Sequence, residues 1–214
     1  MKKVLAACAF LALSLPTIFA HPHVSLDARL QFEFDGKECR GFWVDWTFDA
    51  FFSATVINDF DANGNGRFEP AEIQKVYNGA FINLHKYGFF TLIRKGDKRT
   101  SPEAVENFSA TVRDNRLVYR FFVPLDGKEY GRDFSVAIFD KTYYCAVRYP
   151  EDAVTITQSS EGASSPVWAR EVNKTYPVYY NPAGATTDMT AYSKWKPGLL
   201  TAYPEEIHVQ SASD

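Results

Sequence analysis

Apolar and polar residues alternate along much of this chain, which is the pattern of strands with one buried face. The first run covers residues 24–34, where the apolar positions are Val24, Leu26, Ala28, Leu30, Phe32 and Phe34. Asp35-Gly36 then predicts a hairpin turn, and residues 39–48 return as a second strand. Further strands are predicted at residues 89–94, 107–113, 117–123, 134–139, 143–149 and 154–157. The pattern predicts an α+β fold, mainly an antiparallel β-sandwich or open barrel.

The alternation gives way to helical spacing between about residues 49 and 87. Residues 49–60 predict a first helix. Pro70 can begin a second helix, because a proline at the first helical position gives up no needed hydrogen bond. Apolar residues then follow at helical spacing as far as Gly88, namely Ile73, Val76, Tyr77, Ala80, Phe81 and Leu84. The sequence therefore predicts a helix–loop–helix inserted into a β-rich domain.

The loop of this insertion, residues 61–72, reads Asp-Ala-Asn-Gly-Asn-Gly-Arg-Phe-Glu-Pro-Ala-Glu, which is the spacing of an EF-hand calcium loop. Calcium binds about six to eight oxygen atoms, so one short segment must supply several of them. The predicted ligands are Asp61, Asn63, Asn65, the backbone carbonyl of Arg67, Glu69 directly or through water, and bidentate Glu72. The alternative interpretation is a surface turn rich in Asn and Gly.

Residues 1–20 have the pattern of a cleavable export signal. Lys2 and Lys3 precede a short apolar run at residues 4–15, and Ala20 offers a cleavage site. A membrane-spanning helix needs roughly 20 apolar residues, and this run is shorter. A lipoprotein processing site at Cys8 is a second interpretation. We therefore expect a periplasmic protein that does not span a membrane, with a β-rich domain at residues 21–158. Residues 159–214 are expected to form an irregular extension with one last strand around residues 206–209.

The charge and the cysteines narrow the possible functions. The formal net charge is −3, and removal of the signal would lower it to −5. The chain lacks the excess of basic residues expected of a protein that binds nucleic acid. Cys39 and Cys145 would remain after cleavage, and in an oxidising compartment they could form a disulfide or stay free.

Cleavage after Ala20 would place His21-Pro22-His23 at the amino terminus. The α-amine and imidazole of His21, together with the imidazole of His23, suit Zn²⁺, Ni²⁺, Co²⁺ or Cu²⁺. Pro22 has no backbone N–H, so a square-planar site built on deprotonated amides cannot form fully. A brace made of the amine and imidazoles is compatible with the sequence. The alternative is a frayed, solvated terminus.

Other candidates have both structural and functional interpretations. His85 and His208 are expected to be solvated, although either could supply a third metal ligand. Asp49 fits a helix N-cap, and Asp45 is expected to be exposed on its strand. Asp140 fits a strand–turn–strand junction, or else it lines a pocket with a tyrosine. No serine, cysteine or phosphate-loop nucleophile motif is present in the sequence, so we expect no enzyme.

Three segments together resemble one bacterial family of unknown function: His-Pro-His at residues 21–23, Trp-Thr-Phe-Asp at 46–49 and Asp-Lys-Thr-Tyr-Tyr at 140–144. Members of that family are described as periplasmic components of an uncharacterised ABC-type transport system, often beside nickel/cobalt-type permeases. The likeness runs from His21 to about residue 157. It implies a periplasmic accessory of Zn, Ni or Co transport, with an inner-membrane metal permease as partner and His21 and His23 as metal-binding residues. Lys141 stands where the family pattern has proline.

Three functions therefore stay open. The first is the metal-binding accessory protein with a structural Ca²⁺ site. The second is a calcium-stabilised interaction module without a transition metal. The third is a copper enzyme with a histidine brace, in which His85 or His208 completes the site.

Overall fold

The computed structural model describes residues 22–126, 129–130, 133–185 and 187–210. Most strands belong to two sheets. The first sheet has the order β5-β6-β2-β1-β8, and β9 also pairs with β1. Its strands are β1 Val24–Asp35, β2 Glu38–Phe48, β5 Glu106–Arg113, β6 Arg116–Pro124, β8 Cys145–Arg148 and β9 Val154–Gln158.

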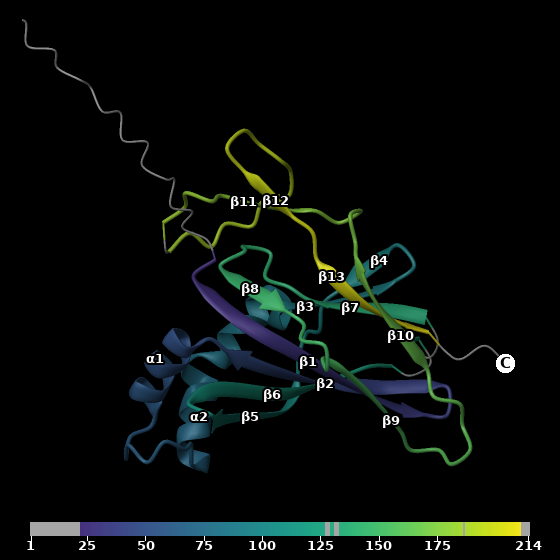
Figure 1. The fold of residues 1–214 in the computed structure, drawn as a ribbon, viewed down its shortest axis with the longest axis horizontal. Helices are drawn as coiled ribbons and strands as arrows, with labels where there is room; N and C mark the ends of the chain where they lie inside the picture. The colour runs from purple at the N-terminus through teal and green to yellow at the C-terminus, as the bar shows by residue number, and fades with distance from the viewer. Residues whose placement is uncertain (1–21, 127–128, 131–132, 186, 211–214) are drawn as a thin grey trace, which may run out of the picture.

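The second sheet has the order β10-β13-β7-β3-β4. Its strands are β3 Thr91–Lys95, β4 Lys98–Thr100, β7 Asp133–Ile138, β10 Val167–Val172 and β13 Glu205–Gln210. A small third sheet pairs β11 Val178–Tyr180 with β12 Leu200–Ala202. The helical segments are α1 Ala50–Phe60, α2 Pro70–Gly79 and the 3-10 segment η1 Phe81–Phe90. In Figure 1, α1 and α2 lie together at one end of the first sheet.

The two large sheets share one apolar core. Alternate residues of β1 are buried, and they meet buried residues of β3, β7 and β13 from the other sheet. The rings of Phe32 and Phe134, one from each sheet, lie 5.9 Å apart. Both sheets are open, with β5 and β10 each at an edge, so the strands do not form a closed barrel. The alternation of apolar and polar residues predicted which face of each strand is buried, but it could not show whether the sheets close.

Two strand pairs are parallel, whereas the sequence pattern indicated mainly antiparallel pairing. β8 lies along the first part of β1, from Val24 to Asp27, and β9 lies along the later part, from Leu30 to Phe34. The other strand pairs of the two large sheets are antiparallel. β1 is therefore held on one side by β2 and on the other by a segment more than 110 residues away along the chain.

The predicted hairpins and helices form, with one break. Asp114 and Asn115 make the turn between β5 and β6, with φ values of 51° and 58°. The expected second helix ends at Gly79 and resumes as η1, because Ala80 leaves helical geometry at φ −125° and ψ −61°. Gly88, expected to end the helix, lies within the kinked end of η1 at φ 59°.

The described residues between 159 and 210 are more regular than the expected irregular extension. They contain four strands, and β13, the strand expected around residues 206–209, is an interior strand between β10 and β7. Ile207 and Val209 are buried in the core. This placement depends on pairing with β7, which the local sequence pattern cannot show.

The two cysteines do not pair. Both are buried and free. Cys39 lies opposite Phe34 at the end of β1, and Cys145 lies opposite Val24 at its start. At about 3.3 Å per residue, the two positions are roughly 30 Å apart along β1. A disulfide needs Cα atoms within about 7 Å, so this pairing is excluded.

Within the residues that the structure covers, no helix is long and apolar enough to cross a lipid bilayer. The proposed export signal at residues 1–20 and Cys8 lie outside the described residues.

Candidate functional site

The segment expected to bind calcium lies between α1 and α2. Its backbone N–H groups bind the side-chain oxygens that were predicted as ligands. Asp61 accepts from Asn65 N at 3.2 Å and from Gly66 N at 2.8 Å. Asn63 Oδ1 accepts from Asn65 N at 3.0 Å, and Asn65 Oδ1 accepts from Arg67 N at 2.9 Å. These bonds fix the three side chains on one short loop, and each oxygen keeps a lone pair for another partner.

Glu72 connects the two ends of this loop. Its Oε1 accepts from Ala62 N at 2.8 Å, and its Oε2 accepts from Glu69 N at 3.0 Å. The residue is 6% exposed, and none of the ion pairs found in the described part of the chain involves it. Glu72 is therefore the N3 residue of the capping box that begins α2, and it also stands at the twelfth position of the loop.

Glu69 lies beside the same carboxyl group. It accepts hydrogen bonds from Asn65 Nδ2 at 2.5 Å and from Asn63 Nδ2 at 3.2 Å. A hydrogen bond with Glu72, followed by the one with Asn65, lowers the pKa of Glu69 to about 2. Across the described residues, no three His, Cys, Asp or Glu side chains converge to hold a metal ion. A calcium ion here would therefore depend on the amide oxygens of Asn63 and Asn65 as well as on carboxylates.

The amino-terminal histidines are only partly covered, because His21 lies outside the described residues. His23 N donates to Tyr144 O at 2.9 Å, and Val24 N donates to the same oxygen at 3.2 Å. The His23 and Tyr144 rings are 5.0 Å apart. These contacts hold His23 at the start of β1, against the segment that leads into β8.

The other two histidines lie in different surroundings. His85 is exposed, and its Nδ1 lies 2.7 Å from the carbonyl oxygen of Ile82. His208 is in the second sheet, with Nδ1 3.0 Å from Ser135 Oγ and Nε2 3.2 Å from Asp133 Oδ1. Ser135 is buried and its hydroxyl also accepts from Arg94. This Ser–His–Asp chain therefore links strands inside the sheet and does not present an accessible nucleophile.

The acidic residues singled out in the sequence have structural partners. Asp49 caps α1, since its Oδ1 accepts from Phe52 N at 2.9 Å, while its Oδ2 accepts from Ser25 N. Asp45 is half-buried and pairs with Arg120 of β6, so the expectation that it is exposed was wrong. Burial raises the pKa of Asp45, and the charge of Arg120 opposes that shift.

Asp140 is fully buried and both of its carboxylate oxygens are used within its own turn. Oδ1 accepts from Thr142 N and from Thr142 Oγ1, each at 2.8 Å, and Oδ2 accepts from Cys145 N at 3.0 Å. Asp140 therefore fixes the junction before β8, which is the structural interpretation of its sequence.

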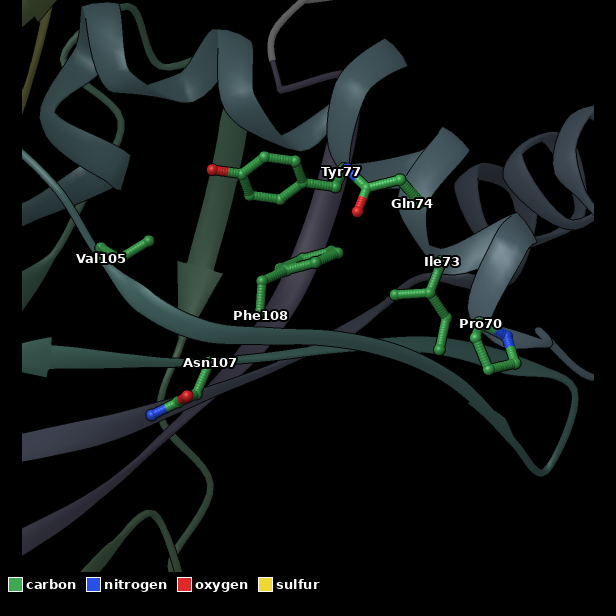
Figure 2. A pocket seen from close by; sticks show the side chains of 7 residues that line it. All are labelled: Pro70, Ile73, Gln74, Tyr77, Val105, Asn107 and Phe108. Atoms are coloured by element: carbon green, nitrogen blue, oxygen red, sulfur yellow. The ribbon is translucent and has the colours of Figure 1, made fainter.

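A groove of about 410 Å³ lies between α2 and β5. Figure 2 shows that side chains of the helix and of the facing strand line it. The rings of Tyr77 and Phe108 lie 5.5 Å apart in its wall. On α2 the lining includes Pro70 and Ile73, which stand on either side of Glu72, the last residue of the predicted calcium loop.

A second, almost entirely apolar cavity of about 180 Å³ lies between the helices and the first sheet. Sequence reasoning did not find it, because its lining comes from six separate parts of the chain. Its residues are Val24, Trp46, Phe48, Phe52, Ala80, Leu84, Phe90, Tyr119, Tyr144, Cys145 and Met189. The high aromatic content of 16% was the one available sequence signal.

Comparisons with known proteins find uncharacterised relatives. The chain is 30% identical over 146 residues to an uncharacterised 15.5 kDa protein in the trpE 3′ region of Spirochaeta aurantia, covering 66% of this chain and 99% of that protein. It is 27% identical over 134 residues to an uncharacterised protein of Haemophilus influenzae strain Rd, covering 62% of this chain and 64% of that one. No solved structure matches. Residues 5–211 match the model of DUF1007, a protein of unknown function, so the chain belongs to the DUF1007 family.

Proposed function

We propose that this protein is a periplasmic metal-binding accessory of a Zn²⁺, Ni²⁺ or Co²⁺ transport system, with Ca²⁺ as a structural cofactor. In this proposal His21 and His23 bind the transition metal and an inner-membrane permease receives or supplies it. The role is not enzymatic. Calcium and the transition metal occupy different parts of the molecule and have different tasks.

The calcium part of the proposal rests on Glu72. Its buried carboxyl group connects both ends of the loop and lies at the twelfth position of an EF-hand spacing, where a bidentate acid is required. The helices on both sides are packed against the first sheet through buried Val56 and Val76. A cation in the loop would therefore join two helices that are already placed by the core.

Only three acidic ligands are available in this loop, since Asn63 and Asn65 are neutral. A low ligand charge favours weaker binding, with dissociation constants of about 10⁻⁴ to 10⁻³ M as in extracellular modules. We propose a structural calcium site that is filled at millimolar calcium, and not a calcium sensor.

The transition-metal part rests on the position of His23. Two backbone hydrogen bonds to Tyr144 and the ring contact hold this residue against the start of β8, which supports a fixed site over a frayed terminus. His21 is two residues away along the chain, and its α-amine is a ligand once the signal is removed. Nitrogen ligands of this kind prefer Zn²⁺, Ni²⁺, Co²⁺ or Cu²⁺ to Ca²⁺.

The test compares two forms of the processed protein, one that begins at His21 and one with a single extra Met before it. The native form should bind Zn²⁺ or Ni²⁺ at least tenfold more tightly in competition titrations, a difference of about 1.4 kcal/mol. His23→Ala with a native terminus should lose affinity in the same way. His85→Ala is the matched control and should leave affinity unchanged. Metal affinity should also fall below about pH 6, because the ligands must be deprotonated.

Equal binding by the two forms would contradict the transition-metal proposal. The calcium-stabilised interaction module would then be the remaining interpretation. Copper-dependent oxidation of a substrate by the native form would instead favour the histidine-brace enzyme. Calcium binding should be the same in all of these variants, so the two parts of the proposal are tested separately.

A further inference from the structure

The loop that leads into β12 presents an exposed aromatic and basic tip. Residues 194–200 read Lys-Trp-Lys-Pro-Gly-Leu-Leu, and Trp195 and Leu200 are 55% and 40% exposed. Lys194 and Lys196 are exposed on either side of the tryptophan, and no ion pair found in the described part of the chain involves either of them. In Figure 1 this loop, at the top of the view, projects beyond the two large sheets. We call residues 194–200 the Trp195 tip.

Two hydrogen bonds hold the turn of this tip. Leu199 N donates to Lys196 O at 3.1 Å, and Trp195 Nε1 donates to Leu199 O at 3.1 Å. Pro197 and Gly198 are the two central residues, and the φ of 93° at Gly198 is the value that a type II turn needs. The indole N–H is therefore bonded inside the turn, and the rest of the ring is presented to solvent in a fixed direction.

The hairpin that carries the tip is anchored to the second sheet. Val178 of β11 is buried in a small cluster with Leu92 of β3 and Phe139. The ring of Tyr180, at the end of β11, is stacked on that of Tyr143 with 4.1 Å between their centroids. Because β11 pairs with β12, these contacts also fix the strand that follows the tip.

The charge of this part of the chain is opposite to that of the whole. Residues 189–204 contain two lysines and no arginine, aspartate or glutamate, which gives them a formal charge of +2, whereas the formal net charge of the chain is −3. The nearest acids along the chain are Asp188 and Glu205. The tip therefore favours a partner with negative charge.

A tryptophan between lysines also suits one class of partner in particular. Tryptophan is enriched at the membrane–water interface, where its amphipathic ring lies at the level of the lipid headgroups. Lysines near a membrane are attracted to anionic phospholipids. A projecting tip reaches a broad surface before the rest of the molecule does, whereas a small ligand needs a concave site.

We propose that the Trp195 tip docks this protein on the surface of a phospholipid bilayer that carries anionic headgroups. Trp195 and Leu200 enter the headgroup region, and Lys194 and Lys196 lie against the lipid phosphates. This docking is separate from the binding of calcium and of a transition metal, and its test requires neither.

Co-sedimentation of the processed protein with lipid vesicles at low salt tests the charge of the tip. Vesicles of equal parts of phosphatidylethanolamine and phosphatidylglycerol should bind the protein, and vesicles of phosphatidylcholine alone should bind it at least about tenfold more weakly. Lys194→Gln with Lys196→Gln should weaken binding to the anionic vesicles by about fivefold for each lysine. Lys75→Gln with Lys86→Gln is the matched control, because both residues are exposed in the helical segments and the charge change is the same. This pair should leave the affinity unchanged.

Fluorescence quenching tests the position of the tryptophan. Anionic vesicles whose acyl chains carry bromine should quench part of the tryptophan fluorescence of the native protein. The quenching should be lost in Trp195→Ala and kept in Trp168→Ala, which removes the 38% exposed tryptophan of β10.

Circular dichroism and thermal unfolding establish that each variant is folded. Absence of binding to anionic vesicles would overturn the proposal and would leave a protein as the partner of the tip. Equal losses of affinity in the two lysine pairs would also overturn it, because net charge alone would then explain the binding. Quenching that persists in a folded Trp195→Ala variant would place the membrane contact elsewhere on the protein.

Discussion

At the scale of single residues, Glu72 differs from the other acids discussed above in its place at the end of the predicted calcium loop. Asp49 caps a helix, Asp140 fixes a turn and Asp45 has an arginine partner. Glu72 is buried too; it accepts one backbone N–H group from each end of the loop and shares a hydrogen bond with Glu69. A carboxyl group at this position of the loop is the most direct reason to expect a cation there.

We predict that Glu72→Gln abolishes calcium binding measured by calorimetry at millimolar calcium. The amide keeps the size and can still accept one hydrogen bond, but it cannot serve as a bidentate anionic ligand. Calcium should also raise the melting temperature of the native protein and leave that of Glu72→Gln unchanged. Glu103→Gln, at an exposed position outside the loop, is the control. Calcium binding of native strength in Glu72→Gln would refute the assignment.

At the scale of elements, the second sheet depends on one buried carboxylate of β13. Glu206 is 2% exposed and accepts hydrogen bonds from Arg94 of β3 at 2.7 and 2.9 Å and from Arg99 of β4 at 2.7 Å. Asn173, which follows β10, donates to it at 3.0 Å. One side chain therefore joins the last strand of the chain to both edges of the sheet.

Glu206→Gln should destabilise the protein by about 3 to 5 kcal/mol in urea unfolding, because two arginines would be left without their buried partner. Glu205→Gln is the matched control. Its carboxylate is 3.6 Å from Arg170 and partly exposed, and such pairs contribute only about 0 to 1 kcal/mol. Similar losses of unfolding free energy in the two variants would show that the cluster around Glu206 stabilises the protein no more than a partly exposed ion pair does.

The same cluster predicts a dependence on pH. Burial raises the pKa of Glu206. Hydrogen bonds from Arg94, Asn173 and Arg99 together lower this pKa by more than burial raises it, so the net pKa is below its usual value. A carboxyl group with a lowered pKa in the folded state stabilises the protein above its usual pKa, and that stability is lost on acidification. The difference in stability between the native protein and Glu206→Gln should therefore be full at pH 7 and shrink below about pH 4.5. A difference that stays constant down to pH 3 would contradict this.

At the scale of the whole molecule, the length of β1 keeps the two cysteines apart. Denatured, unreduced protein that has lost residues 1–20 should therefore react with two equivalents of a thiol reagent. In the folded protein both thiols should react slowly, because they are buried and burial raises the pKa of Cys39 to about 12 and that of Cys145 further. One or no reactive thiol in the denatured protein would show a disulfide, which would require a different strand arrangement.

Local patterns predicted a large part of this structure. The alternation in β1, the turn at Asp35-Gly36 and the cap at Asp49 each depend on neighbouring residues only, and all three form. The ligand spacing of residues 61–72 is local in the same sense. Features that depend on distant residues were missed: the parallel pairs of β1, the interior position of β13, and the apolar cavity. The contact between His23 and Tyr144 spans about 120 residues and could not be read from either segment.

The pairing of β1 with β8 and β9 has a consequence for how the chain folds. The first strand cannot complete its hydrogen bonds until residues 145–158 are present, and the second sheet must wait for β13 near the end of the chain. Contacts between residues so far apart in sequence slow folding, because the chain loses conformational entropy on closing a long loop before these contacts can stabilise it. We therefore expect the two-sheet core to form only after the residues of β13 have been synthesised.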